Sequence, residues 1–154
     1  MATLVLVDDF ADRLDALAGV LADDALRVSL YAGVRTSLDV ALANWLAPDA
    51  PGNRRRLAVL QDTGALVGGV RVGRDSIYWF VGRACSGRGL GTEMVTQMIA
   101  CLDPAETPVI DAAVARENAA SRRIAAKTGF AEIGLRHRPS GLPPLIECRR
   151  ILSA

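Results

Sequence analysis

The chain has 154 residues, with 18 basic Lys and Arg side chains against 17 acidic ones, so its formal net charge is +1. This length is typical of one domain with a sizeable core, and we expect a single domain over residues 1–154. The charge balance argues against a nucleic-acid partner, because phosphate backbones are bound through a clear basic excess. The acidic start and the short apolar runs disfavour a targeting peptide and a membrane span, so we expect a cytoplasmic protein without a membrane partner.

The amino-terminal half contains both helical and strand patterns. Apolar spacing predicts a strand at 3–7, a helix from Asp9 to Leu21, and a second helix from its N-cap Ser37 to Leu46. Turn residues at 47–53 precede a strand at 56–61, and Asp62-Thr63-Gly64 predicts a hairpin turn into a strand at 65–72.

The most informative segment runs from a strand at 77–81 through a glycine-dense turn into a helix. The continuous aromatic and β-branched residues of that strand predict burial on both faces. Gly87, Gly89 and Gly91 allow positive φ and close backbone approach, while the N–H groups of the first helical turn attract anions. Because Arg88 adds positive charge, residues 87–92 are predicted to form a phosphate cradle.

Two common phosphate-binding motifs do not fit this cradle. The nucleoside-triphosphate loop requires Lys and then Ser or Thr after Gly87, where Arg88 and Gly89 stand. The dinucleotide fingerprint requires glycine where Thr92 or Met94 stands. Nucleotide hydrolysis and hydride transfer are therefore disfavoured.

The carboxy-terminal part predicts a strand at 108–114, a capped helix, and closing strands near 131–136 and 145–151. The helix starts after the N-cap Asn118 and ends before Gly129, with Lys127 in its last turn. Cys85, Cys101 and Cys148 have no metal-ligand spacing, so we expect reduced thiols and no metal. Strands and helices mixed in this way predict one α/β domain with a mixed sheet.

The cradle and the Asn118 helix together resemble the GNAT superfamily of acetyl-CoA-dependent N-acetyltransferases. Ser86 departs from the family pattern, in which an Arg or Gln begins the pyrophosphate loop. The serine at position 121, three residues after Asn118, resembles the pattern of the Rim-type branch of ribosomal-protein N-terminal acetyltransferases. The leading segments 24–28 and 37–46 are similar to the paired leading helices of the same branch. The resemblance implies an α+β fold with a mixed, mostly antiparallel central sheet flanked by about four helices.

The resemblance implies transfer of an acetyl group from acetyl-CoA to a primary amine of a small molecule or a peptide N-terminus. A CoA-binding sensor without turnover and an acyltransferase using a longer acyl-CoA stay open as alternatives, as does a homodimer. The residues expected to bind the cofactor are Phe80, Val81, Arg83, Ser86, Gly87, Arg88, Gly89, Leu90, Gly91, Thr92, Asn118, Ser121 and Arg122.

Catalytic roles are less directly indicated. The tyrosine that many members place seven residues after the asparagine is Ala125 here, so Ser121 is the substitute candidate for protonating the thiolate. The alternative for Ser121, a serine that only satisfies first-turn backbone groups, stays open. By resemblance, Asn118 would bond the pantetheine or the acyl carbonyl, and the Val81 N–H would stabilise the oxyanion. Tyr78 is a second candidate acid, with a core position as its alternative.

The general base is expected to be a carboxylate. Asp111 stands among apolar strand residues, so it is a candidate for the base, for an anchor of a cationic acceptor, or for a surface residue. Glu117 and Glu147 are weaker candidates. The stiff, basic loop 136–144, which contains His137, is expected to shape the choice of acceptor.

Overall fold

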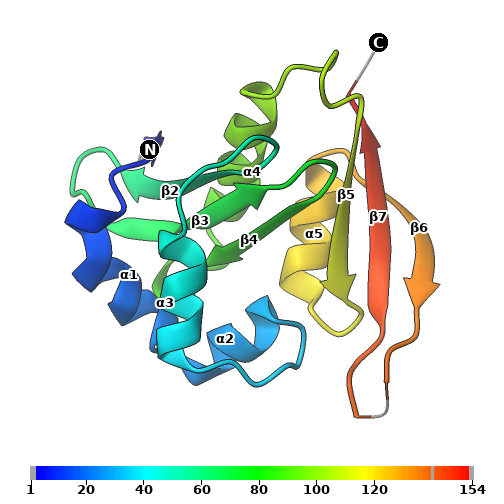
Figure 1. Cartoon of the computed structure of the whole chain (residues 1–154), viewed down its shortest axis with the longest axis horizontal. Coiled ribbons are helices and arrows are strands. Elements are labelled where there is room, and N and C mark those ends of the chain that lie inside the picture. Colours follow the sequence, from blue (N-terminus) through cyan, green and yellow to red (C-terminus); the bar gives the residue numbers. More distant parts are fainter. Residues whose placement is uncertain (1–2, 140, 153–154) are drawn as a thin grey trace.

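The computed structural model describes residues 3–139 and 141–152, which form two antiparallel sheets (Figure 1). The first sheet has the order β1-β2-β3-β4 and the second has the order β5-β7-β6. The strands are β1 (Leu4–Val7), β2 (Arg54–Leu60), β3 (Leu66–Val72), β4 (Ile77–Val81), β5 (Val109–Ala115), β6 (Ala131–Arg136) and β7 (Leu145–Ile151).

Helices cover the sheets on opposite faces. The helices α1 (Leu14–Leu21) and α3 (Leu38–Leu46) pack on one face of the first sheet, where Trp45 and Phe80 are buried in a shared cluster. The helix α2 (Asp24–Leu30) lies beside them and also contacts β4. The helices α4 (Leu90–Ala100) and α5 (Ala119–Lys127) belong to the core on the other face. Met94 and Ile110 are fully buried in that core, which joins the two sheets.

The two sheets meet at one point and then diverge. A parallel bridge pairs Ser76 with Asp111, and below it β4 and β5 run apart, with α2 near the opening (Figure 1). This bridge is the only parallel pairing found among the described residues, so the expected mixed sheet is antiparallel within each of its two parts.

The split also corrects the expected burial of the strand at 77–81. Ile77, Trp79 and Phe80 are buried, but Tyr78 is 36% exposed. Tyr78 lies on the same face of β4 as Phe80, beyond the ring of Trp45, where no strand or helix covers it fully.

The remaining differences concern the amino-terminal helices. The helix expected from Asp9 to Leu21 begins with a 3-10 turn, Ala11–Arg13, before α1 starts. The segment compared above with a leading helix forms α2, whose N-cap Asp23 accepts hydrogen bonds from Ala25 and Leu26. With α2, the described chain has five α-helices rather than about four.

Other sequence expectations can be compared directly with the structure. Cys85, Cys101 and Cys148 are all free, as expected, and the first and third are buried. Among the described residues, no helix combines the length and the apolar character needed to cross a membrane. The same residues contain no group of three or more His, Cys, Asp or Glu side chains placed to hold a metal ion.

Candidate active site

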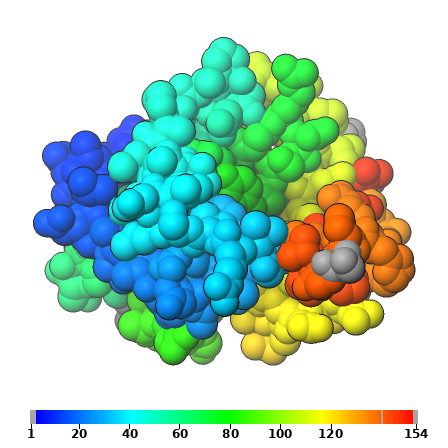
Figure 2. All heavy atoms as spheres, turned by 60° about the horizontal axis from the view of Figure 1, so that its bottom comes forward, coloured from blue at the N-terminus to red at the C-terminus, as the bar shows by residue number. Residues whose placement is uncertain are grey.

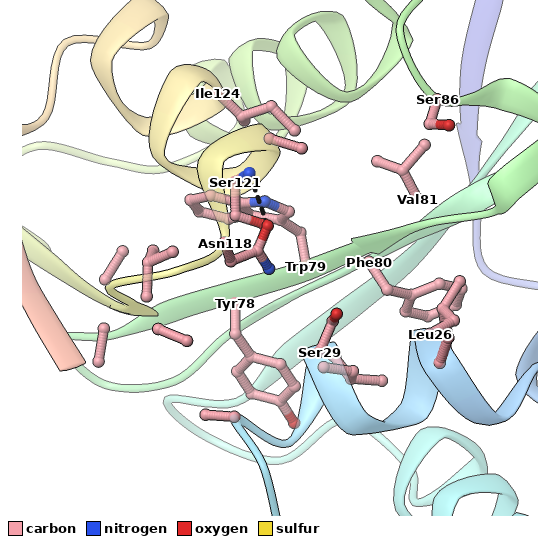
Figure 3. A pocket seen from close by; sticks show the side chains of 18 of the residues that line it. Leu26, Ser29, Tyr78, Trp79, Phe80, Val81, Ser86, Asn118, Ser121 and Ile124 are labelled. Atoms are coloured by element: carbon pink, nitrogen blue, oxygen red, sulfur yellow. Dashed lines mark hydrogen bonds between the residues drawn. The ribbon is translucent and has the colours of Figure 1, made fainter. Parts of the chain in front are cut away.

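A cavity of about 260 Å³ lies in the split between β4 and β5, and we call it the central cavity (Figure 3). Its walls come from α2, β4, β5 and the start of α5. The lining residues predicted from the sequence are Tyr78, Phe80, Val81, Arg83, Ser86, Asn118 and Ser121. The split therefore brings together predicted residues that are up to 43 positions apart in the chain, from Tyr78 to Ser121.

The cradle lies next to this cavity, immediately after Ser86. Gly87 and Gly89 both adopt φ of 75°, and neither has an atom within 4 Å of the position where a Cβ would stand. Gly89 is the N-cap of α4, and the first helical hydrogen bond runs from the Glu93 N–H to the Gly89 carbonyl. The amides of residues 90–92 thus precede the helical hydrogen-bond ladder and are available to an anion.

Gly91 has a different role from the other two cradle glycines. A Cβ there would lie 2.6 Å from Ile124 Cδ1 and 2.8 Å from Val81 Cγ2. The absence of a side chain lets α4 approach α5 and β4 closely. Gly91 therefore fixes where the first turn of α4 lies relative to the central cavity.

Asn118 caps α5 and faces the cavity at the same time. Its Oδ1 accepts a hydrogen bond of 3.1 Å from the Ser121 N–H, shown as a dashed line in Figure 3. Because the oxygen is used in the cap, the Nδ2 group is the end of the amide that is left for a ligand. In Figure 3 this nitrogen points away from the helix, toward the open space beside β4.

Ser121 lines the cavity from the first turn of α5, and its side chain is partly buried. Among the described residues, its hydroxyl makes no hydrogen bond, so it does not serve the helix backbone. One turn later, Ala125 is buried with 2% exposure and packs in the core. On α5 it is therefore Ser121, and not residue 125, that brings a side-chain hydroxyl to the cavity wall.

The backbone of β4 turns alternate N–H groups toward the split. The Gly82 N–H bonds to the Val67 carbonyl of β3. In an antiparallel ladder adjacent residues point their N–H groups in opposite directions, so the N–H of Val81 faces β5. Since β5 has diverged at this level, the Val81 N–H points toward the central cavity, where an acceptor atom of a ligand can bond to it.

Arg83 lines the cavity but is already engaged. Its guanidinium bonds to Asp23, with Nε 3.0 Å from one carboxylate oxygen and Nη2 3.1 Å from the other. Asp23 is the N-cap of α2 and also lines the cavity. This ion pair connects α2 to the end of β4, and Arg83 remains 71% exposed at its side chain.

Several predicted residues lie outside the cavity wall, among them Asp111, Arg122 and Arg88. Asp111 pairs with Arg149 through hydrogen bonds of 2.8 and 3.0 Å, which hold the pKa of its carboxyl below the usual value. A lowered pKa makes a carboxylate a weaker base, so this geometry does not favour Asp111 as the base. Arg122 forms an ion pair with Glu132 on β6, and Arg88 is exposed on the surface of the cradle.

Asp23, described above, and Arg71 were not predicted from the sequence, whereas Arg138 belongs to the loop 136–144, which was. Asp23 lines the central cavity, and each of the two arginines contacts a residue that lines it. The Arg71 guanidinium donates to the Tyr78 hydroxyl at 3.2 Å and to the Asn44 carbonyl at 2.6 Å. Burial raises the pKa of Tyr78 in spite of Arg71, so its hydroxyl stays protonated at neutral pH.

Arg138 connects the loop 136–144 to the other half of the molecule. Its Nη1 donates to the carbonyl of Ala32, which lines the cavity, and to that of Pro143 at 3.3 Å. Pro143 also packs against Gly33. Figure 2 shows this contact as the cyan segment after α2 lying against the orange β6–β7 loop.

Comparisons with known proteins were made on the sequence and on the fold. Residues 8–131 match the family model described as acetyltransferase (GNAT) domain. A search of curated proteins finds no match.

Solved structures of similar fold cover almost the whole chain. The RimL ribosomal-protein α-N-acetyltransferase, solved with coenzyme A, has a TM-score of 0.78 at 16% identity, over 99% of this chain and 96% of that one. Spermidine N-acetyltransferase from Vibrio cholerae, solved with CoA and spermine, has a TM-score of 0.75 at 13% identity, over 97% and 95%. A GCN5-related N-acetyltransferase from Kribbella flavida has a TM-score of 0.74 at 21% identity, over 98% of each chain. Since the family model spans most of the sequence and these folds agree with it, the chain belongs to the GNAT acetyltransferase domain family.

Proposed function

We propose that this protein transfers an acetyl group from acetyl-CoA to a primary amine within the central cavity. The observation that carries the proposal is the cradle, whose unpaired amides lie beside a strand that is split from its neighbour. A diphosphate on residues 87–92 would place the pantetheine arm along β4, toward Asn118. Similar solved structures contain CoA or acetyl-CoA, which is consistent with this use of the cradle.

The residues in the cavity have separate tasks in this reaction. Asn118 Nδ2 and the Val81 N–H, both on the cavity wall, would hold the acyl carbonyl and stabilise the charge that develops on its oxygen. As the amine nitrogen bonds to the carbonyl carbon, the carbon–sulfur bond breaks and the sulfur takes up a proton. Ser121 has a free hydroxyl on this wall, so we assign the relay of this proton to it: the hydroxyl donates to sulfur while it takes up a proton from water, so that no alkoxide is left.

The amine must lose a proton, and no carboxylate in the cavity is free to take it. Asp23 is the only acidic residue among the described cavity-lining residues, and it is bonded to Arg83 and to two α2 amides. We therefore propose that the proton leaves through water, which makes the acceptor's own pKa decide the pH dependence. A cytoplasmic location fits the three free cysteines and is part of the proposal.

The proposal is tested by adding a side chain to the cradle. Gly89→Glu places a carboxylate where the diphosphate would lie, so we expect acetyl-CoA binding by isothermal titration calorimetry to be lost. Gly64→Glu is the matched control, because Gly64 has φ of 72° and, like Gly89, no atom within 4 Å of its Cβ position. Both variants add the same charge at a glycine of nearly the same φ, so the difference between their binding of acetyl-CoA reports on the cradle.

Two measurements complete the test. Saturable one-to-one binding of acetyl-CoA and thiol release with an amine panel are expected from the wild type and from Gly64→Glu. Unchanged binding by Gly89→Glu would contradict the cradle. Binding of acetyl-CoA without thiol release for any amine would support a CoA-binding sensor without turnover. Faster thiol release from a longer acyl-CoA than from acetyl-CoA would support an acyltransferase that uses the longer chain.

A further inference from the structure

The acceptor end of the central cavity has no free negative charge. This end is the part near Tyr78, away from the cradle, and its other lining residues include Ser29, Ala32 and Ala113. The one acidic lining residue, Asp23, is held by Arg83 at the cradle end. An acceptor with several positive charges would have to be desolvated there without a carboxylate to receive it, which is unfavourable.

Two carboxylates lie on the open face of the second sheet, but each is compensated. Asp111 is opposite Arg149 in the β5–β7 register and forms its ion pair with that residue. Glu147 is opposite Ala113, which lines the cavity, and it accepts a hydrogen bond of 2.7 Å from Arg136 Nε. The pairing removes most of the attraction that these groups would exert on a cationic acceptor.

Two arginines at the same end have neutral partners. Arg71 bonds to a hydroxyl and a carbonyl, and Arg138 bonds to two carbonyls. Among the described residues, neither guanidinium lies within ion-pair distance of a carboxylate. Arg71 Nε is also buried without a hydrogen-bond partner. The acceptor end therefore carries uncompensated positive charge from both halves of the molecule.

Tyr78 lines the cavity and contacts Arg71, which polarises its hydroxyl. Its oxygen accepts from Arg71 Nη1, so its own proton is free to be donated elsewhere. A hydroxyl polarised by a guanidinium is a strong donor to an anion. The ring is fixed by its edge contact with Trp45, at 5.7 Å between centroids, so the position of this donor is defined.

We propose that the acceptor is an amine that also carries a carboxylate a few bonds away, and that Tyr78 and Arg71 select it. This inference rests on the acetyl transfer proposed above. The carboxylate would bond to the Tyr78 hydroxyl, with Arg71 behind it and Arg138 at the mouth of the cavity. The same chemistry is offered by a free amino acid and by a peptide with acidic residues next to its N-terminus.

The test compares acceptors that differ in one charged group. Leucine and leucinamide form one pair, an N-terminally free acidic tripeptide and its glutamine counterpart form the second, and spermidine represents polycations. We expect kcat/KM for the carboxylate member of at least one pair to be about 10 to 100 times higher, the value of a hydrogen bond to a charged group. The pair that shows the preference tells whether the acceptor is a free amino acid or an acidic peptide. The preference should decrease as salt is added.

Variants assign the preference to the two residues. Tyr78→Phe keeps the ring on Trp45 but removes the hydroxyl, and Arg71→Gln removes the charge. Both should raise KM for the carboxylate acceptor about tenfold more than they raise KM for leucinamide. Arg54→Gln is the control, since Arg54 contacts the Cys101 carbonyl instead of the cavity.

The outcomes separate this inference from the proposed function. Acetylation of spermidine, or of the pair members that lack the tested carboxylate, at equal or higher kcat/KM would overturn the inference and leave acetyl transfer standing. Equal losses in Tyr78→Phe for acceptors with and without the tested carboxylate would also overturn it. A wild-type protein that does not bind acetyl-CoA would remove both proposals.

Discussion

At the scale of single residues, the site is built from side chains that serve the fold and the ligand together. Asn118 Oδ1 caps α5 while its Nδ2 is left to the cavity. Asp23 caps α2 and holds Arg83. A substitution at either position therefore changes stability and binding at once, unless it is chosen to keep one function.

Asn118 allows the two functions to be separated. Asn118→Asp keeps an oxygen for the Ser121 N–H, so the free energy of unfolding should change by less than about 0.5 kcal/mol. It replaces the donor with a negative charge, so kcat/KM should fall about 10- to 100-fold. Asn118→Ala should lower both activity and the free energy of unfolding, the latter by about 1 kcal/mol. Denaturant titration and steady-state kinetics measure these effects, and full activity in Asn118→Asp would exclude the proposed role of Nδ2.

At the scale of secondary-structure elements, the position of α4 depends on the closeness of its first turn to α5. The contact passes through Gly91, with Ile124 on α5 and Val81 on β4 as its neighbours. The same turn supplies the amides of the cradle. Small changes in this packing should therefore change the affinity for acetyl-CoA.

A double-mutant cycle tests the contact. Gly91→Ala places a Cβ 2.6 Å from Ile124 Cδ1, and we expect it to destabilise the protein by about 1–3 kcal/mol through overpacking and to weaken acetyl-CoA binding. Ile124→Val removes that Cδ1 atom, so the double variant should recover part of both losses. Thermal unfolding and calorimetry provide the readouts. Strictly additive effects would show that the Ile124 contact does not set the position of α4.

At the scale of the whole molecule, two sheets share one core and one bridge, and the central cavity separates them elsewhere. A ligand in the cavity would contact β4 and β5 together. Its binding should stabilise the folded state by about 2.7 kcal/mol at a concentration of one hundred times Kd.

Hydrogen exchange shows whether the ligand acts on both sheets. With CoA bound, we expect slower amide exchange in the cradle, in β4 over 79–82 and at the start of α5 over 118–122, and a higher melting temperature. The β1–β2 pair, which lies far from the split in the strand order, serves as the internal reference. Protection limited to the cradle would mean that the pantetheine arm does not follow β4.

The sequence was most informative where the chemistry is local. The cradle glycines, the Asn118 cap and most strand positions follow from residue type and spacing, and the structure confirms those elements. The partners of the charged groups did not follow, because Asp111 meets Arg149 across 38 positions and Arg83 meets Asp23 across 60. Arg71 and Tyr78 could be paired only once the β3–β4 register was known. Pairing between residues far apart in the chain decides which charged side chains have no partner of opposite charge. The positive charge at the acceptor end could therefore not be predicted from the sequence.

The order of the second sheet has a consequence for how the protein is made. Since β7 lies between β5 and β6, neither of these strands has its neighbour until residues 145–151 have been synthesised. On the ribosome, the edges of β5 and β6 would stay without hydrogen-bonded neighbours while the first sheet and α4 already fold. Nascent chains of increasing length should therefore resist proteolysis in two stages, and the second should begin only after β7 emerges.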